Sequence, residues 1–471
     1  MQLNDFFIFM KQELMITIIL FILLFIKVGS KEWRTESLLN LLNILLLVNF
    51  LSGFFCMSYG MLFNEMFRTN ELITLEKNIL NLGVLLISLQ SYSWLKNHHH
   101  VLEFYMLLLS SLMGMFFMIS SGNLLMFYLA LELSTIPLAA IANFDLDKRQ
   151  SSESAFKLII SSAFSSGLLL FGISLIYGTT GTIIFSEITP LLTGSPLQIF
   201  AFILLLAGFG FKVSAVPFHL WTADVYEGAP VCVTSYLSVI SKGSVLFVFV
   251  TVLYTVFKPL ASDWYNMICL LSVITIITGN LFAIRQNNFK RFLAFSSIAQ
   301  VGFILIGISG SSQAGMASVV YFVLIYLFSN LGAFGVVSLV SALKGKEKIE
   351  DYAGFYKTNP FLSWVLAISL FSLAGVPPTA GFFGKFFLLM AGASQGNYLL
   401  IAIASLNMII SFYYYLRIIK IMFMDKNDNP VEKISIPFLP KVAILICLVN
   451  MIIIGIDGDI YQYIYTLCIG M

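Results

Sequence analysis

The chain has 471 residues, of which 59% are hydrophobic and 11% charged, with a formal net charge of +2. A soluble domain carries roughly a quarter of charged residues, so this composition excludes an ordinary soluble protein. The basic residues are spread through short loops and give no sign of nucleic-acid binding. Apolar segments of about 18 residues or more recur along the chain, and each is long enough to cross a bilayer. The sequence therefore predicts an all-α polytopic membrane protein.

The apolar segments between polar breaks predict about 14 transmembrane helices. In chain order they cover residues 13–28, 36–59, 75–95, 101–119, 122–142, 152–178, 197–225, 230–256, 263–284, 289–309, 314–342, 359–391, 397–424 and 437–456. We expect three N-terminal helices in 1–100, two groups of five in 101–256 and 257–424, and a C-terminal helix in 425–471. The connections are too short to hold a soluble domain.

The loops that follow odd-numbered spans hold most of the Lys and Arg residues, such as Lys148, Arg149, Lys290 and Arg291. Positive loops of a membrane protein stay in the cytoplasm. Both termini are therefore expected on the non-cytoplasmic side, and an even number of spans agrees with that.

Four charged residues lie far from either end of a predicted span: Glu132 in "LALELSTIP", Lys212, Lys242 and Lys385. A charge at the bilayer centre costs at least about 2.5–3.5 kcal/mol, so such residues normally face a polar interior. A lysine can instead reach an interface or satisfy a helix end, but these three lie too deep. By contrast, Lys157 is near a span's start and four residues from Glu153, which predicts an ordinary helix salt bridge.

The chemistry of these residues suits proton transfer. A neutral lysine accepts a proton, a lysinium ion releases one, and a nearby carboxylate favours the charged form. Glu132 and Lys212 are thus a candidate switchable pair, in which the lysine holds its proton when the two are together and tends to release it when they separate.

Two spans are predicted to break. Pro217 in "SAVPFH" interrupts the seventh span near Lys212, and Pro377 in "AGVPPT" interrupts the twelfth near Lys385. Broken helices at matching places in two halves indicate an ion site between internal repeats. An offset of five spans means that the two copies cross in opposite directions, so the sequence predicts two inverted five-helix repeats.

The segments around these residues resemble the antiporter-like membrane subunits of respiratory complex I, the proton-pumping NADH:quinone oxidoreductase, and most of all the subunit N family. The resemblance rests on "FKVSAVPFHLWTADVYEGAP", "SKGSVLF", "NFKRFLAFSSIAQVGFIL" and "LAGVPPTAGFFGKF" and runs from about residue 100 to 424. It implies that Glu132 is the fifth-helix glutamate and Lys212 its broken-helix partner. Lys242 would be the central eighth-helix lysine, and Lys385 the twelfth-helix lysine.

The resemblance further implies that one proton crosses per subunit and cycle, driven by redox chemistry in distant subunits. No cofactor is expected in this chain, since FMN, iron–sulfur clusters and quinone belong to partner subunits. The five isolated cysteines agree with that, because they form no CxxC pair. The expected partners are other membrane-arm subunits of a hetero-oligomer. The length and the extra N-terminal helices favour a bacterial plasma membrane.

Several questions stay open at this point. Gln300 in "SSIAQVG" stands where related subunits carry histidine, and a glutamine can order water but cannot titrate. His219 either takes part in proton transfer along the axis formed by Glu132 and the three lysines or caps the broken helix, and we favour the cap. The "YYYLRIIK" segment at 413–420 is interpreted as an aromatic belt, and "HHH" at 98–100 as a solvated loop.

Two other functions compete with proton pumping in complex I. One is a subunit of a multisubunit cation/proton antiporter, and the other is a scaffold that moves no protons.

Overall fold

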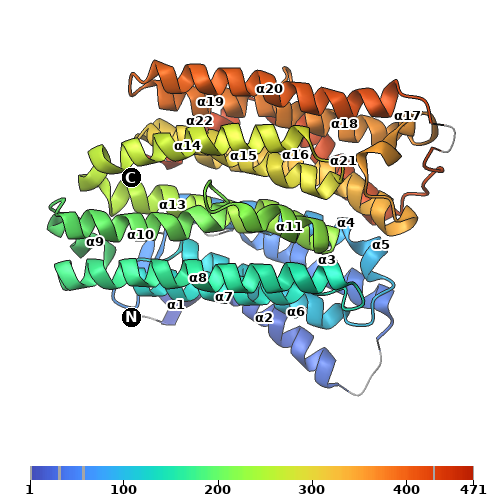
Figure 1. Ribbon diagram of the computed structural model, residues 1–471. Helices are drawn as coiled ribbons and strands as arrows, with labels where there is room; N and C mark the ends of the chain where they lie inside the picture. The colour runs from blue at the N-terminus through green and yellow to red at the C-terminus, as the bar shows by residue number, and fades with distance from the viewer. Residues whose placement is uncertain (1–2, 30–32, 56–58, 428–429, 470–471) are drawn as a thin grey trace.

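The computed structural model describes residues 3–29, 33–55, 59–427 and 430–469. Its helices run side by side in an elongated bundle (Figure 1). In the described ranges, 12 helices are long and apolar enough to cross a membrane. Two shorter apolar helices, α18 (Pro360–Ala374) and α19 (Ala380–Ala393), together make the twelfth predicted span. The predicted all-α membrane fold is confirmed.

The N-terminal part begins at one flank of the bundle. Its helices are α1 (Leu3–Phe9), α2 (Lys11–Val28), α3 (Thr35–Ser52), α4 (Glu71–Gln90) and the single turn α5 (Tyr92–Leu95). A small antiparallel hairpin of β1 (Gly60–Leu62) and β2 (Phe67–Thr69) precedes α4, and the sequence did not predict it. The predicted second span, 36–59, is too long at its end, because α3 stops at Ser52; residues 56–58 lie outside the described ranges.

The first group of five spans follows. It consists of α6 (Val101–Ile119), α7 (Leu124–Ala142), α8 (Arg149–Thr180), α10 (Pro196–Val213) with α11 (Leu220–Gly228), and α12 (Val231–Tyr236) with η2 (Leu237–Ser241) and α13 (Lys242–Thr255). The short α9 (Phe185–Ile188) and η1 (Thr189–Leu191) connect α8 to α10.

The second group repeats this order of helices. It consists of α14 (Ala261–Ile284), α15 (Phe289–Ser309), α16 (Gln313–Lys344), the pair α18 and α19, and α20 (Tyr398–Phe423). The connecting elements are η3 (Lys258–Leu260), η4 (Ile349–Tyr352) and α17 (Phe355–Thr358), and the chain ends in α21 (Phe438–Ile456) and the short amphipathic α22 (Asp459–Leu467). The third helix of each group, α8 and α16, has 32 residues.

Both predicted helix breaks are present. After α10, Ser214 takes a left-handed conformation (φ 66°), and α11 resumes at Leu220 beyond Pro217. After α18, Gly375 is left-handed (φ 89°), a conformation that glycine adopts without steric cost, and α19 resumes beyond the two prolines. A proline ring removes one backbone donor and clashes with the preceding turn, so neither helix continues through.

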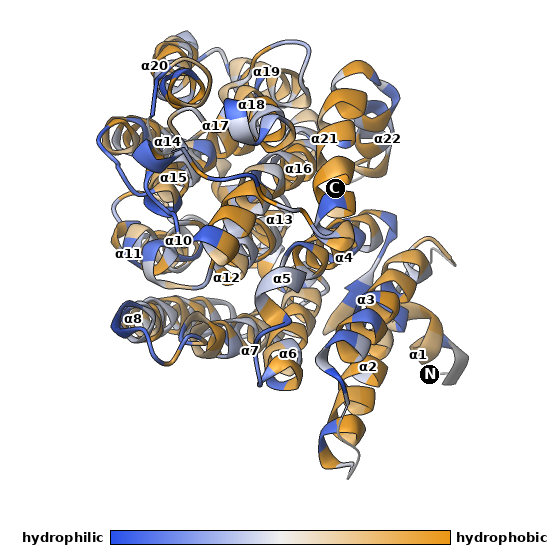
Figure 2. Ribbon diagram, turned by 90° about the vertical axis from the view of Figure 1, so that its right-hand side faces the viewer, coloured by the Kyte–Doolittle hydropathy of each residue, from blue (hydrophilic) through white to orange (hydrophobic). Residues whose placement is uncertain are grey.

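The helices α13, α15 and α16 lie in the interior of the bundle. Every residue in the apolar window of α15 is buried, whereas about 39% of the window is buried in α8 and 33% in α20. Figure 2 shows the bundle along the helix axes, with α15 and α16 inside and α8 and α20 at its edge. Polar groups carried by α15 are therefore shielded from lipid by neighbouring helices.

Candidate proton-transfer site

Lys212 lies in the last turn of α10, just before the first break. Its Nζ atom donates to the Thr135 hydroxyl of α7 at 2.7 Å and to the Ser162 hydroxyl of α8 at 2.8 Å. Both hydroxyls are buried. The ammonium group is therefore held between two helices by neutral acceptors that it can leave without separating an ion pair.

The break beside Lys212 is closed by protein groups. The Trp221 indole donates to the Phe211 carbonyl at 3.1 Å, and the Thr222 hydroxyl donates to that of Ser214 at 2.7 Å. The backbone N–H of Val216 donates to the Thr275 hydroxyl of α14 at 3.0 Å. Backbone groups freed inside a membrane need such partners, so Lys212 is not needed to satisfy them.

Glu132 lies on α7, one turn before Thr135, and its carboxylate is within electrostatic range of Lys212. The two do not form an ion pair in the described part of the chain, since Lys212 is occupied by the two hydroxyls. The Glu132 Oε1 atom is buried without a hydrogen-bond partner among the described residues. The switchable pair of Glu132 and Lys212 stays a prediction.

Lys242 lies at the centre of the bundle, 2% exposed, and its Nζ atom donates to the Ser297 hydroxyl of α15 at 2.7 Å. The π-helical turn η2 directly precedes it. Such turns loosen the backbone and are frequent at functional sites. The ammonium group also lies 5.3 Å from the centre of the Tyr226 ring.

Lys385 lies in α19, 1% exposed, and bends back to the end of α18. Its Nζ atom donates to the Leu373 carbonyl at 2.8 Å and to the Ala374 carbonyl at 3.1 Å. These carbonyls lost their intrahelical partners at the second break. The lysine therefore acts as the cap of the broken helix as well as a candidate proton carrier.

Gln300 lies on α15, the helix that also carries the Ser297 partner of Lys242. It lies three residues after Ser297, and its amide donates to the Leu373 carbonyl at 2.9 Å and to the Tyr415 hydroxyl at 3.2 Å. Its Oε1 atom is buried without a partner in the described ranges. A glutamine in this place can hold a water molecule between the lysine sites, as its chemistry suggested.

The tyrosines of α20 correct the interpretation of "YYYLRIIK". Tyr413 is 62% exposed, but Tyr414 and Tyr415 are buried at 1% and 0%. Tyr414 donates to the Asn280 side chain at 3.0 Å, and Tyr415 is hydrogen-bonded to Ser296 and Gln300. The aromatic-belt interpretation is therefore wrong for two of the three tyrosines. Tyr414 and Tyr415 face the polar interior of the bundle.

His219 does not cap α11 through its side chain. It occupies the N-cap position, but no side-chain cap hydrogen bond forms. The imidazole is buried beside the Pro217 carbonyl, within electrostatic range of Lys242, and its Nδ1 atom has no partner among the described residues. The imidazole therefore does not cap the start of α11, but it lies against the backbone of the first break, and both roles of His219 stay predictions.

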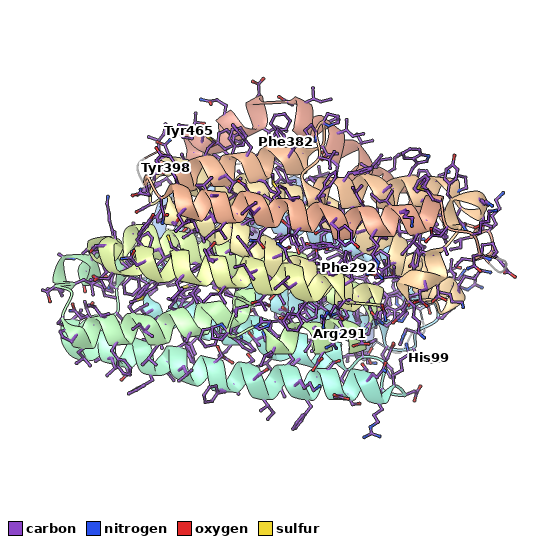
Figure 3. The ribbon with its side chains drawn as sticks, turned by 45° about the horizontal axis from the view of Figure 1, so that its top comes forward. His99, Arg291, Phe292, Phe382, Tyr398 and Tyr465 are labelled. Carbon is purple, nitrogen blue, oxygen red and sulfur yellow. The ribbon has the colours of Figure 1, made fainter. Side chains whose placement is uncertain are left out.

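The predicted pair of Lys157 with Glu153 is confirmed at 2.6 Å, and the same ammonium group also reaches Asp224 of α11 at 2.7 Å. Arg291 of α15 joins Asp224 and Glu227 at 2.8 Å each. Figure 3 shows Arg291 and His99 towards one end of the bundle and Tyr398 and Tyr465 towards the other. This ionic cluster fixes α8, α11 and α15 near one membrane surface.

The sequence reasoning missed charges in the first three spans. Lys77 of α4 pairs with Glu13 of α2 at 2.5 Å, both 1% exposed, and Glu76 is buried to the same degree. The prediction of only three deep lysines and one deep carboxylate is therefore wrong. The signal was the dipeptide Glu76–Lys77, which lies inside the predicted span 75–95.

The comparisons with known proteins cover most of the chain. Residues 121–411 match the family described as "NADH:quinone oxidoreductase/Mrp antiporter, TM". NADH-quinone oxidoreductase subunit N from Phocaeicola vulgatus is 45% identical over 461 residues, which is 96% of this chain and 97% of that protein. The chain belongs to the subunit N family. The protein of the same name from Azobacteroides pseudotrichonymphae is 43% identical over 99% of this chain and 98% of its own length.

Solved structures agree with the subunit N fold. A chain of respiratory complex I from Thermus thermophilus with bound aureothin has a TM-score of 0.79 and 26% identity, covering 94% of this chain and 96% of that chain. A chain of the Mrp complex from Dietzia has a TM-score of 0.85 at 18% identity, covering 97% and 96%. The second likeness shows the fold alone. Among the described residues, no group of three His, Cys, Asp or Glu side chains is placed to hold a metal ion.

Proposed function

We propose that this chain translocates protons as a membrane-arm subunit of a bacterial NADH:quinone oxidoreductase, and that Glu132, Lys212, Lys242 and Lys385 carry them. The observation behind the proposal is the placement of Lys242 and Lys385 against one fully buried helix, α15. Buried lysines in a membrane normally mark an ion pathway.

Protons would pass along the lysines by way of the uncharged hydrogen-bond partners of each ammonium group. Lys242 is held by one hydroxyl and Lys385 by two carbonyls, so neither is locked to a carboxylate. Gln300 would order water between them with its free Oε1 atom. His219 would connect the first break to Lys242. Pro217 and Pro377 would keep the two breaks open rather than take part in proton transfer.

Glu132 would control whether Lys212 holds or releases its proton. When the carboxylate approaches, Lys212 keeps its proton; when it withdraws, the half-buried ammonium group keeps its bonds to Thr135 and Ser162. Loss of a nearby negative charge favours release of the proton from a buried lysine. The separated arrangement is therefore the releasing state of the switch.

The proposal includes an internal symmetry. Residues 101–256 and 257–424 would be inverted repeats, flanked by 1–100 and 425–471. Matching breaks in α10–α11 and α18–α19, together with two 32-residue helices in the third place, support this division. Both termini would lie on the non-cytoplasmic side. FMN, iron–sulfur clusters and quinone would be held by partner subunits.

The test is Lys242→Met in the assembled complex, with Lys357→Met as the matched control, because Lys357 is an exposed lysine. Inverted membrane vesicles report NADH oxidation and proton uptake together. We expect Lys242→Met to lower NADH-driven proton uptake by about tenfold or more, since a positioned proton carrier contributes at least that much, while Lys357→Met changes nothing. Normal uptake in assembled Lys242→Met complex would favour the scaffold instead.

A subunit of a cation/proton antiporter is the second candidate, because the matching family description names both. It predicts a smaller assembly without NADH dehydrogenase activity and sodium-dependent pH changes in vesicles. A native gel stained for NADH oxidation separates the two.

A further inference from the structure

Apart from Lys212, Lys242 and Lys385, which we call the lysine axis, the helix α4 carries a second set of buried polar groups. Its buried polar side chains lie along the whole span, although 89% of its apolar window is inside the protein; they are Thr74, Glu76, Lys77, Asn78, Asn81, Ser88 and Gln90. Figure 2 shows α2 and α3 at the edge of the bundle, next to α4 and α6. A polar face on a membrane helix needs partners or water.

Lys77 is the satisfied part of this set. Its ammonium group pairs with Glu13 at 2.5 Å and lies 5.1 Å from the centre of the Phe67 ring and 5.9 Å from that of Phe116. With its charge matched by one carboxylate, Lys77 is not available to neutralise a second one.

Glu76, the neighbouring residue, has no such partner among the residues that the structure describes. Its side chain is 1% exposed, and its Oε1 atom has no hydrogen-bond partner in the described ranges. An ionised carboxylate that is buried without a partner is strongly disfavoured, so a buried acid of this kind takes up a proton.

The charges around Glu76 come from several elements. Arg68 of β2 and Lys77 are the cations within electrostatic range, and the Cys468 thiol after α22 also lies within that range. Arg68 and Glu76 form no ion pair in the described part of the chain, and the Arg68 Nε atom is itself buried without a partner there. A cation and an acid thus lie near each other without contact, and each retains hydrogen-bonding capacity.

A pocket lies beside the start of α4, one helical turn before Glu76. The pocket has a volume of about 640 Å³ and is lined by Arg68, Leu72, Tyr254, Lys258 and Thr466, among others. Leu72 lies four residues before Glu76, which is one helical turn. Arg68 thus lines the pocket, with its guanidinium 5.2 Å from the centre of the Phe185 ring, and lies within electrostatic range of the carboxyl group.

The polar face continues beyond Glu76 and retains free hydrogen-bonding capacity. Asn49 of α3 donates to Asn81 at 2.7 Å, and Ser88 donates to Asn43 of α3 at 2.7 Å. The remaining amide atom of each of these three asparagines is buried without a partner among the described residues. Buried polar atoms are normally hydrogen-bonded, so this interface has the composition of one that holds water.

We propose that Glu76 is a proton-binding site outside the lysine axis, loaded from the pocket beside the β1–β2 hairpin, with Arg68 as the cation that sets its proton affinity. The site goes beyond the proposed function, because it concerns proton binding at the N-terminal helices and stands whether or not the lysines pump.

The test is infrared difference spectroscopy of the purified complex between alkaline and acidic buffer. Wild type is compared with Glu76→Gln and with the matched control Glu71→Gln, whose carboxyl group is exposed at the pocket rim. We expect a carboxylic-acid C=O band that appears on acidification, is lost in Glu76→Gln and persists in Glu71→Gln. No band that depends on Glu76 would overturn the proposal, even if the lysine variants lose pumping.

Arg68→Gln provides the second measurement and remains available if Glu76→Gln fails to assemble. Removing a nearby positive charge favours the protonated acid, so the band should persist to a higher pH than in wild type. An unchanged titration in Arg68→Gln would overturn the role of Arg68. A carboxylate band at every pH would overturn proton binding itself.

Discussion

The two broken helices share a Val-Pro and a lysine, yet they use the lysine differently. At the first break, side chains of Trp221 and Thr275 satisfy the freed backbone groups, and Lys212 points away to hydroxyls of α7 and α8. At the second break, Lys385 itself donates to the freed carbonyls at the end of α18.

This difference separates a mobile lysine from a structural one. Lys212 can change partners without exposing backbone groups, which suits a switch controlled by Glu132. Lys385 cannot leave its carbonyls without leaving that of Ala374 unsatisfied in a low-dielectric interior, because only the Leu373 carbonyl has a second donor, Gln300. The same Val-Pro break with a nearby lysine therefore has a mobile lysine in one copy and a capping lysine in the other. Mutations of the two lysines can distinguish these roles.

The largest effect is expected for Lys385→Met, which removes both the proton carrier and the cap. Gln300 still donates to the Leu373 carbonyl, so the Ala374 carbonyl is the one left unpaired, at a cost of about 1–3 kcal/mol. We expect a lower thermal midpoint of the purified complex together with loss of NADH-driven proton uptake.

Lys385→Arg is the matched control for that variant. An arginine retains N–H donors but stays charged, so it should recover stability without recovering proton transfer. Equal stability of the Met variant and wild type would show that the cap is dispensable.

Lys212→Met is expected to have the next largest effect, mainly on pumping. Thr135 also donates to the Leu131 carbonyl at 2.7 Å, so its hydroxyl keeps a partner when the lysine is gone, and only the Ser162 hydroxyl loses its contact. We expect proton uptake in vesicles to fall about tenfold or more, while the thermal midpoint falls less than in Lys385→Met, because no backbone carbonyl is left unpaired. A loss of stability as large as in Lys385→Met would remove the distinction between the two breaks.

Trp221→Phe tests the indole group, which satisfies a freed carbonyl at the first break as Lys385 does at the second. The variant loses the indole N–H but keeps the ring, and the Phe211 carbonyl retains its bond from the Ser214 N–H at 3.0 Å. Loss of one hydrogen bond predicts destabilisation by about 0.5–1.5 kcal/mol. Thermal unfolding measures it, and the protons moved per NADH should not change; a change in that ratio would mean that the first break does more than hold its shape.

His99→Ala is expected to have the smallest effect. This residue of the "HHH" segment is exposed and lies at the end of the bundle in Figure 3. Exposed substitutions of this kind change stability by no more than about 0.5 kcal/mol. Thermal unfolding and pumping should both match wild type, and a loss of activity on addition of a chelator to wild type but not to His99→Ala would instead indicate a metal at this loop.

Much of the fold followed from apolar length and proline. Long apolar segments have one stable solution in a bilayer, and a proline inside them forces a break, so both breaks and the depth of Lys212 and Lys242 were predictable. The boundary of α3 and the β1–β2 hairpin were not, because polar and apolar residues mix there and local patterns do not fix where such a segment packs.

The charged and aromatic residues of the N-terminal spans and α20 were the weakest part of the prediction. Glu76 and Lys77 lie near the start of a span, where a charge normally reaches the interface. Tyr414 follows Tyr413, which does face outwards. Only the packing of other helices over these positions makes them interior.

Composition and sequence pattern were enough to predict that the chain spans a membrane, that two of its helices break, and that three lysines lie near the breaks and the bundle centre. These are properties of composition and of the backbone, which hydrophobic length and proline control locally. The tertiary structure alone decided which group satisfies each buried charge: hydroxyls for Lys212, Ser297 for Lys242, helix-end carbonyls for Lys385, and Glu13 for Lys77. Hydrogen-bond partners come from helices distant in sequence, and their approach depends on how the whole bundle packs.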